Sequence, residues 1–286
     1  MQSPGPPRTL YHYCSTEAFY EIVKTKSIWL SSLSLSNDTL EGEKIIARII
    51  DRLAAQGVFK EQVMWRFKYT FMQYERQWEG LGFCLSERGD LLSQWRGYAK
   101  DATGVAIGFA YDSLLKLAMQ SGKPPLSLEK IEYDSAVHWS LTKPIYQRIL
   151  DYVNNNPLMP FDKTMANVPP LNYEGPHSSD EIMMSKFALG SKDIHDLLFR
   201  LKLPAFKEEE EWRLLNLSMR GASNYFYRPR GNSLVPYLKY DFSGFAPFIT
   251  DVILGPKHET PAHIIDKFLN QNGYGVRAKL SEASYR

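Results

Sequence analysis

The chain has 286 residues, of which 44% are apolar, and a formal net charge of only +2. A chain of this length and composition can bury a sizeable core, and it suits one large domain or a core with an inserted helical subdomain. The near balance of 34 basic and 32 acidic residues excludes a surface that binds polyanions over its whole extent, although it allows a local basic patch.

Further classes are excluded by the cysteines, the histidines and the hydropathy pattern. Cys14 and Cys84 are too few for a disulfide framework or a four-cysteine zinc site, and the six histidines have no ligand-like spacing, so we expect no metal. Residues 1–9 contain three prolines and no apolar run, which predicts a disordered leader and not a signal peptide. No apolar stretch approaches the roughly 20 residues that cross a bilayer. We therefore expect a cytoplasmic protein without membrane contact.

The first half of the chain is predicted to contain strands with helices between them. Alternating apolar residues indicate strands, and apolar residues three and four apart indicate helices. A Ser or Thr at residue 15 or 16 is a typical N-cap for the first helix. The predicted elements are strands at 10–14, 28–30, 81–85, 104–110 and 131–133, and helices from 17, from 38 or 39 to 53, and at 61–78, 91–98 and 111–120.

The middle of the chain differs from both ends. Helical patterns at 141–155 and 179–203 flank residues 156–177, which hold five prolines and little periodicity. This predicts a helical insertion over about 135–203, with a Pro-rich loop (156–177), in a single domain of residues 1–286. After Pro204 the patterns predict strands at 212–217, 223–228, 236–240, 249–254 and 274–279, and a helix at 262–270.

This order of elements favours an α+β fold with a mixed or antiparallel β core and surrounding helices over a doubly wound parallel sheet. The sequence has no phosphate-binding glycine loop, no dinucleotide fingerprint, no His-Glu-x-x-His zinc motif and no Gly-x-Ser-x-Gly elbow.

An acidic turn, Glu208 to Glu211, precedes one of the late strands. By spacing alone it is a solvated charge cluster between a helix and a strand. However, in an extended entry to a strand Glu209 and Glu211 point the same way, whereas Glu208 and Glu210 face solvent. Two carboxylates on one face can grip a sugar diol or a nucleophile.

Two other segments are candidates for a site. His12 lies between two tyrosines in the first strand and faces opposite to both, either half-buried and bonded to backbone or presented on the wall of a cleft. In the segment 94–99, Trp95 is typical of a helix that packs its aromatic face into the core. Tyr98 can pack in the same way and still aim its hydroxyl at a ligand.

Taken in order along the chain, these pieces resemble a bacterial family known as "domain of unknown function 2971". The resemblance rests on segments 10–13, 28–32, 37–38 with Glu41, 83–86, 95–99, 104–105, 206–213, 235–237 and 253–256, and on Ser281 with residues 285–286. The family's general setting implies bacterial toxin or phage-defence systems.

The same order also resembles ADP-ribosyltransferases of the His-Tyr-Glu type. The matching positions are His12, segment 83–86 with Tyr98, and the Glu209-x-Glu211 pair, while Tyr13 stands where such enzymes often have Gly. This resemblance implies an ADP-ribosyltransferase-like fold and NAD as the substrate. The acceptor of ADP-ribose is then a protein, a nucleic acid, a small molecule or water.

The resemblance also implies roles for individual residues. Glu211 would accept from the 2′-hydroxyl of the nicotinamide ribose and stabilise the oxocarbenium-like charge, and Glu209 would orient the attacking group. His12 would bond the ribose or the carboxamide. The remaining cofactor-binding candidates are the aromatic residues Tyr98, Trp95 and Tyr13 for stacking on nicotinamide, Arg213 and Arg96 for the pyrophosphate, and Ser86 at the end of its strand.

Two alternatives stand beside this hypothesis. Arg220, Arg228 and Arg230, with the aromatic residues 225–227 between them, suit stacking on a single strand in a non-catalytic nucleotide- or nucleic-acid-binding module. The same segment is also typical of a β-hairpin with a solvated basic face. An NAD-dependent RNA 2′-phosphotransferase is the other alternative, but the chain shows no cluster of arginines of the kind those enzymes place around the phosphate.

Overall fold

The structure is a computed structural model. It describes residues 8–35, 47–48, 50–57, 76–120, 126–155, 193, 196–222 and 224–285. The chain divides into two compact units. Unit 1 comprises Met1–Ser36, Gly80–Ile131 and Ala205–Arg286, and unit 2 comprises Asn37–Glu79 and Glu132–Pro204.

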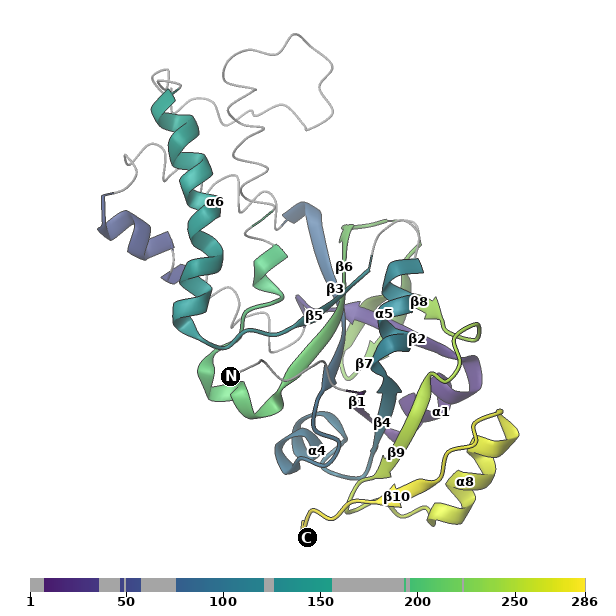
Figure 1. Cartoon of the computed structure of the whole chain (residues 1–286). Helices are drawn as coiled ribbons and strands as arrows, with labels where there is room; N and C mark the ends of the chain where they lie inside the picture. Colours follow the sequence, from purple (N-terminus) through teal and green to yellow (C-terminus); the bar gives the residue numbers. More distant parts are fainter. Residues whose placement is uncertain are drawn as a thin grey trace. The chain divides into compact units, whose positions relative to one another are not determined.

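Most of the described elements belong to unit 1, where strands are the commonest element (Figure 1). In chain order they are β1 (Thr9–Cys14), α1 (Thr16–Thr25), β2 (Ser27–Ser32), β3 (Trp78–Ser86), α4 (Leu92–Tyr98), β4 (Val105–Ala110), α5 (Tyr111–Gln120), β5 (Ser127–Lys130), the 3-10 helix η1 (Pro204–Glu209), β6 (Glu211–Met219), β7 (Phe226–Arg230), β8 (Ser233–Asp241), β9 (Ile249–Leu254), α8 (Ala262–Gln271) and β10 (Ala278–Leu280). The start of β3 and of η1 lies in unit 2.

Local sequence explains where α1 begins and ends. The hydroxyl of Ser15 accepts from the backbone N–H of Ala18 at 3.2 Å, as an N-cap does. The helix ends at Lys26, whose φ of 49° is left-handed and stops the repeat. Between these points Phe19, Ile22 and Val23 are spaced so that one face is buried.

The strands form one mixed sheet with the order β10-β9-β4-β1-β3-β2-β8-β7, and β6 joins it by pairing with β3 and β5. β1 and β4 are antiparallel over their whole length, from Thr9 opposite Ala110 to Cys14 opposite Val105. β10 runs parallel to β9. Helices and a large mixed sheet confirm the predicted α+β class.

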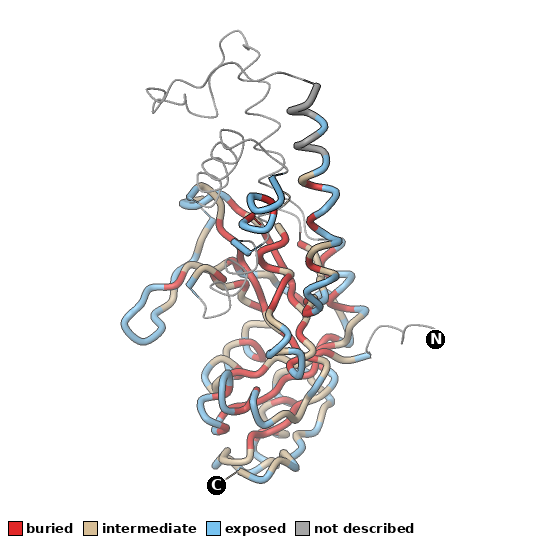
Figure 2. Tube along the Cα trace, turned by 90° about the vertical axis from the view of Figure 1, so that its left-hand side faces the viewer, coloured by how far each residue is buried: buried red, intermediate tan, exposed pale blue. Residues whose placement is uncertain are grey.

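Buried residues are concentrated along the interior strands (Figure 2). Alternation along β4 divides the core between the two faces of the sheet. Val105, Ile107 and Phe109 join the main cluster, to which α1, α5 and α8 also contribute. Ala106 faces the other way, into a smaller cluster with Trp95 of α4. The small alanine leaves room for the indole, so α4 packs on the face opposite the main core.

In unit 2 the structure describes the helix α6 (Ser135–Asn155). Trp139 of this helix lies under the guanidinium of Arg52, with 4.4 Å between the Arg52 Cζ and the ring centroid. The expected insertion (135–203) coincides closely with the second segment of unit 2. The expected Pro-rich loop (156–177), most of the helix at 61–78 and residues 1–7 of the expected leader lie outside the described residues.

Several predicted boundaries are wrong. Thr9 belongs to β1 and not to a leader, because it pairs with Ala110. The strand expected at 131–133 lies at Ser127–Lys130, where it pairs with β6. The last strand, expected at 274–279, lies at Ala278–Leu280. The 3-10 helix η1 was not predicted, because six residues without a regular apolar repeat carry no periodic signal.

None of the helices that the structure describes is long and apolar enough to cross a membrane. Within the same residues, no group of three or more His, Cys, Asp or Glu side chains could hold a metal ion.

Candidate functional site

The sheet opens between β1 and β3. These two strands pair at a single position, Tyr11 opposite Ser86 at the end of β3. The earlier part of β3 pairs with β2, with Gly82 opposite Ser31. The side chain of His12 fills the opening. Its Nδ1 lies 2.8 Å from the carbonyl oxygen of Cys84, and its ring stacks on Phe83 with 4.0 Å between centroids. The Cys84 carbonyl therefore accepts from the imidazole of His12 and not from a backbone N–H of β1, so its hydrogen-bonding capacity is satisfied.

The contacts of His12 determine its protonation. Burial of the imidazole and, to a smaller extent, the positive charge of Arg228 lower its pKa to about 4, although the bond to Cys84 opposes this. The ring is therefore neutral near pH 7. Because a carbonyl only accepts, Nδ1 carries the proton and Nε2 is a bare acceptor. His12 is half-buried and bonded to backbone, as one of the two sequence interpretations has it, and at the same time it lines a cavity.

We expect His12 to make the chain less stable in mild acid. Its pKa is about 4 in the folded chain against 6.5 for a free histidine, so the unfolded chain takes up the proton first as the pH falls. The contribution of neutral His12 to the free energy of unfolding is therefore complete above about pH 6.5 and is lost as the pH falls to about 4. The expected loss is about 3 kcal/mol, because one pKa unit corresponds to about 1.4 kcal/mol.

Urea unfolding at several pH values measures this effect. His12→Asn, which keeps a donor for the Cys84 carbonyl, should flatten the decline in the free energy of unfolding between pH 7 and pH 4. The exposed His263 offers the control, since His263→Asn should leave the decline as in wild type. An unchanged pH profile in His12→Asn would contradict the assignment.

The acidic turn is built by a change of backbone conformation. η1 ends at Glu209, Glu210 takes a left-handed φ of 43°, and β6 starts at Glu211. The Ser86 hydroxyl donates to the Glu209 carbonyl at 2.7 Å, and the Glu87 N–H donates to the Glu210 carbonyl at 3.1 Å, which attaches the turn to the end of β3. The expected extended entry is wrong.

The side chains of Glu209 and Glu211 nevertheless line the same cavity, and both are buried, whereas Glu208 is exposed as expected. Glu210 is only half-exposed. Glu208 is therefore a solvated charge, whereas Glu209 and Glu211 are not part of a solvated cluster.

Glu211 is held by Arg213. Its two carboxylate oxygens accept from Nε and Nη2 of Arg213 at 2.5 and 2.9 Å, and the arginine side chain is only 3% exposed. The expected contact of Arg213 with a pyrophosphate is therefore wrong, because its guanidinium is committed to a buried bidentate ion pair. Two residues that are two apart in a strand share a face, so the spacing Glu-x-Arg was the signal for this pair.

The helix α4 supplies another wall. Tyr98 is 43% exposed, and its hydroxyl lies 3.5 Å from Oε1 of Glu209. Gln94 lies one helical turn before Tyr98 and is buried at the same cavity. Gln94 was not among the predicted site residues, although the spacing of four residues places it on the same helical face as Tyr98.

Two aromatic residues have structural roles in place of the expected stacking. Trp95 is fully buried and packs edge-on against Tyr13, so it cannot stack on a nicotinamide ring. Tyr13 lines the cavity but is 5% exposed, and its hydroxyl donates to the Arg88 carbonyl and accepts from the Leu91 N–H. Tyr98 is therefore the aromatic residue that remains for stacking.

The last residues of the chain hold α4 in place. The indole N–H of Trp95 donates to Oδ1 of Asp90 at 2.6 Å, and the Ser281 hydroxyl and the Glu282 N–H donate to the same carboxylate at 2.6 and 2.7 Å. Burial alone would raise the pKa of Asp90, but these hydrogen bonds outweigh burial and hold the pKa below its usual value. Segment 281–282 thus anchors the helix that carries Tyr98.

Asp90→Asn should lower the free energy of unfolding by about 1–3 kcal/mol at pH 7, because hydrogen bonds to a charged acceptor are lost around a buried indole. Since the pKa of Asp90 is depressed in the folded chain, its contribution is present above about pH 4 and is lost as the pH falls further. The difference between variant and wild type should accordingly shrink in acid. Urea unfolding at pH 7 and pH 3 checks this, with the exposed Asp112→Asn as the control.

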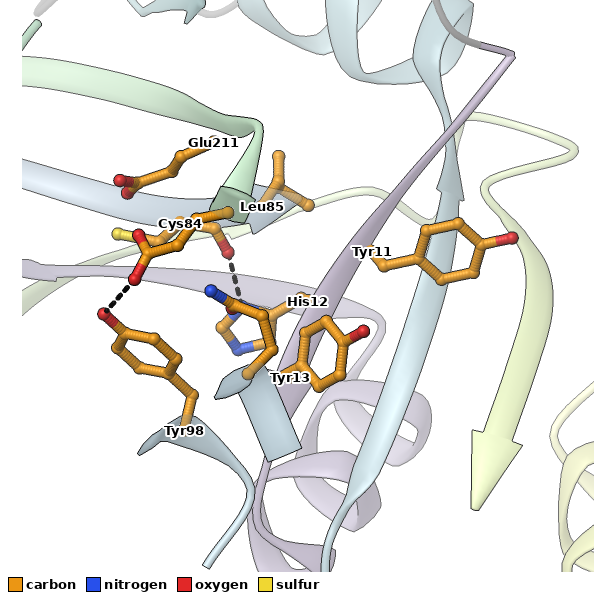
Figure 3. A pocket seen from close by; sticks show the side chains of 9 residues that line it. Tyr11, His12, Tyr13, Cys84, Leu85, Tyr98 and Glu211 are labelled. Carbon is orange, nitrogen blue, oxygen red and sulfur yellow. Dashed lines mark hydrogen bonds between the residues drawn. The ribbon is translucent and has the colours of Figure 1, made fainter. Parts of the chain in front are cut away.

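The cavity has a volume of about 50 Å³ and is lined by residues of β1, β3, α4, η1 and β6 (Figure 3). Of the predicted site residues it brings together His12, Tyr13, Tyr98, Glu209 and Glu211. It does not include Ser86, Trp95, Arg96 or Arg213. Arg96 is exposed and lies over the ring of Tyr285 at 5.7 Å, so its expected contact with a pyrophosphate at this cavity is not supported. The lining residues that the sequence did not indicate are Tyr11, Cys84, Leu85 and Gln94.

The basic and aromatic segment of the alternative hypothesis lies in β7 and the turn before it. Arg228 turns inward and donates from Nη2 to the Ser31 hydroxyl at 2.9 Å, and Arg230 donates to the Leu35 carbonyl. Phe226 and Tyr227 are exposed.

Residues 94–214 match the family described as "Protein of unknown function (DUF2971)". This segment begins in α4 at Gln94 and ends in β6 just after Arg213, so it contains Tyr98, Glu209 and Glu211. The chain matches neither a curated protein nor a solved structure. The resemblance to the DUF2971 family is thereby confirmed over residues 94–214.

Proposed function

We propose that the chain is an NAD-dependent ADP-ribosyltransferase-like enzyme, with a β core of that kind, and that the cavity at the opening of the sheet is its active site. Four side chains from four different elements support the proposal by meeting there: His12 of β1, Tyr98 of α4, Glu209 of η1 and Glu211 of β6. A bare imidazole nitrogen, two carboxylates and a half-exposed phenol suit a ribose that carries a flat leaving group.

The size of the cavity limits what it can hold. One water needs roughly 10–15 Å³ in the same measure, so about 50 Å³ accommodates a few heavy atoms and not a whole nucleotide. The ribose hydroxyls therefore enter the cavity, while the nicotinamide ring lies against Tyr98, which is 43% exposed at the rim.

The two carboxylates exchange the roles that the resemblance implies. Arg213 neutralises much of the charge of Glu211 and fixes its position, which suits the orientation of the attacking group. Glu209 then accepts from the 2′-hydroxyl and stabilises the positive charge that develops on the ribose. His12 accepts from a second ribose hydroxyl through Nε2.

The bond between ribose and nicotinamide breaks with its electron pair going to the nicotinamide nitrogen, so that nicotinamide leaves neutral. An oxygen or nitrogen of the acceptor then forms the new bond to the ribose carbon. The proton that the acceptor loses passes to a carboxylate or to water.

Incubation of the protein with NAD labelled in the nicotinamide or in the adenosine part tests the proposal. We expect release of labelled nicotinamide, either with water alone or after addition of a bacterial lysate, and transfer of the adenosine label to one fraction of that lysate. No release under any of these conditions would contradict the proposal and favour the binding-module hypothesis. We further propose a cytoplasmic location and a role in bacterial toxin or phage-defence systems.

A further inference from the structure

A second cavity, of about 120 Å³, also has His12 in its lining. His12 and Cys84 line both cavities, and Trp29, Ser31, Phe83 and Arg228 contribute to the second one. By the measure of roughly 10–15 Å³ for one water, it has room for a group of several heavy atoms. All of its lining residues belong to unit 1.

Arg228 brings a positive charge to this cavity without a carboxylate beside it. No acidic residue lines the cavity, and no ion pair joins Arg228 to the described part of the chain. Burial of the Arg228 guanidinium lowers its pKa, and the positive charge of Arg230 lowers it further. A partly buried guanidinium without a counter-charge is costly, and such cations usually pair with an anion.

Two residues that line this cavity each carry a buried hydrogen-bond donor without an acceptor. The Nε of Arg228 and the Nε1 of Trp29 are shielded from solvent, and neither has a hydrogen-bond partner in the described residues. Neighbouring side chains hold both residues in place. The Cζ of Arg228 lies 5.9 Å from the centroid of the Trp29 ring, and its Nη2 donates to the Ser31 hydroxyl. The Trp29 ring stacks on Tyr237 with 4.9 Å between centroids. Buried donors without acceptors are rare, and a ligand is one way to satisfy them.

We propose that the second cavity binds a phosphate-type oxyanion, which accepts from Nε of Arg228 and Nε1 of Trp29. A tetrahedral oxyanion offers several acceptor oxygens to the two donors and supplies the counter-charge that Arg228 lacks. The inference stands on this cavity alone and does not require the proposed reaction. If both hold, the diphosphate of a dinucleotide is the source of the anion.

Isothermal titration with inorganic phosphate and with ADP-ribose tests the site. We expect wild type to bind at least one of them. Arg228→Gln should weaken binding about 10- to 100-fold, as loss of a charge-assisted hydrogen bond does. Trp29→Phe keeps the aromatic ring and removes the donor, so it should weaken binding about 3- to 10-fold. Circular dichroism establishes that each variant is folded, and Trp29→Phe tests the site even if Arg228→Gln does not fold.

Arg230→Gln is the matched control, because Arg230 is exposed, lies on the same strand and carries the same charge without lining the cavity. Binding within about twofold of wild type is expected. An equal loss in Arg230→Gln and Arg228→Gln, or unchanged binding in Arg228→Gln and Trp29→Phe, would overturn the site, as would no binding of either ligand.

The two ligands distinguish the sources of the anion. Binding of phosphate and ADP-ribose with the same dependence on Arg228 assigns the cavity to a single phosphate group, and binding of ADP-ribose alone assigns it to a nucleotide diphosphate. Arg228-dependent binding without any release of nicotinamide would support this site and contradict the proposed function.

Discussion

Replacement of Glu209 by Gln should lower the rate of nicotinamide release by a factor of about 10² to 10³. Loss of one electrostatic contact to a developing charge has this effect in other enzymes. Gln keeps the shape and one acceptor oxygen for the Tyr98 hydroxyl. The turn is held through the Glu209 backbone carbonyl by Ser86, and the substitution does not alter that bond. The fold should therefore persist.

Steady-state release of nicotinamide, measured beside urea unfolding of the same preparation, separates lost chemistry from lost structure. Glu208→Gln is the matched control, since Glu208 is the preceding residue and is exposed. It should release nicotinamide at the wild-type rate. Wild-type release from Glu209→Gln would remove Glu209 from the mechanism.

Replacement of Glu211 by Gln should have the largest effect on stability, a loss of about 3–5 kcal/mol. The substitution breaks the buried ion pair between Glu211 and the guanidinium of Arg213, which is only 3% exposed. Urea unfolding measures the loss.

An exposed ion pair serves for comparison. The Nζ of Lys130 lies 2.7 Å from Oε1 of Glu87, but the lysine side chain is 55% exposed. Lys130→Met should therefore lower the free energy of unfolding by less than about 1 kcal/mol. A similar small loss in Glu211→Gln would mean that Arg213 does not hold the carboxylate.

Short-range patterns predicted the local structure well. The strand at Ile249–Leu254 and the helix at Tyr111–Gln120 have the predicted bounds, and Ser15 caps α1 as expected. These features depend on alternation, helical spacing and a capping hydroxyl, all within one segment. Boundaries failed where pairing with a distant strand decided them, as at Ser127–Lys130, whose partner is β6.

Part of the candidate site could also be predicted. The order of the motifs along the chain indicated His12, Tyr98, Glu209 and Glu211, and the structure gathers these four at one cavity. The roles of Trp95, Arg96, Ser86 and Arg213 could not be predicted in the same way, because a role depends on what each side chain contacts. The buried indole, for example, donates to Asp90, and Asp90 is held in turn by Ser281 near the other end of the chain.

The amino-acid sequence by itself determined that this is an α+β chain with an acidic turn near its late strands and a histidine in its first strand, because alternation and composition act over short distances. Only the tertiary structure decided which carboxylate is held by an arginine, which aromatic residue reaches a cavity, and that His12 lines a second cavity. Those outcomes depend on contacts such as His12 with Cys84 and Tyr98 with Glu209, which join residues 72 and 111 positions apart. No local pattern specifies contacts over such distances, since they depend on how β3 divides its pairing between β1 and β2.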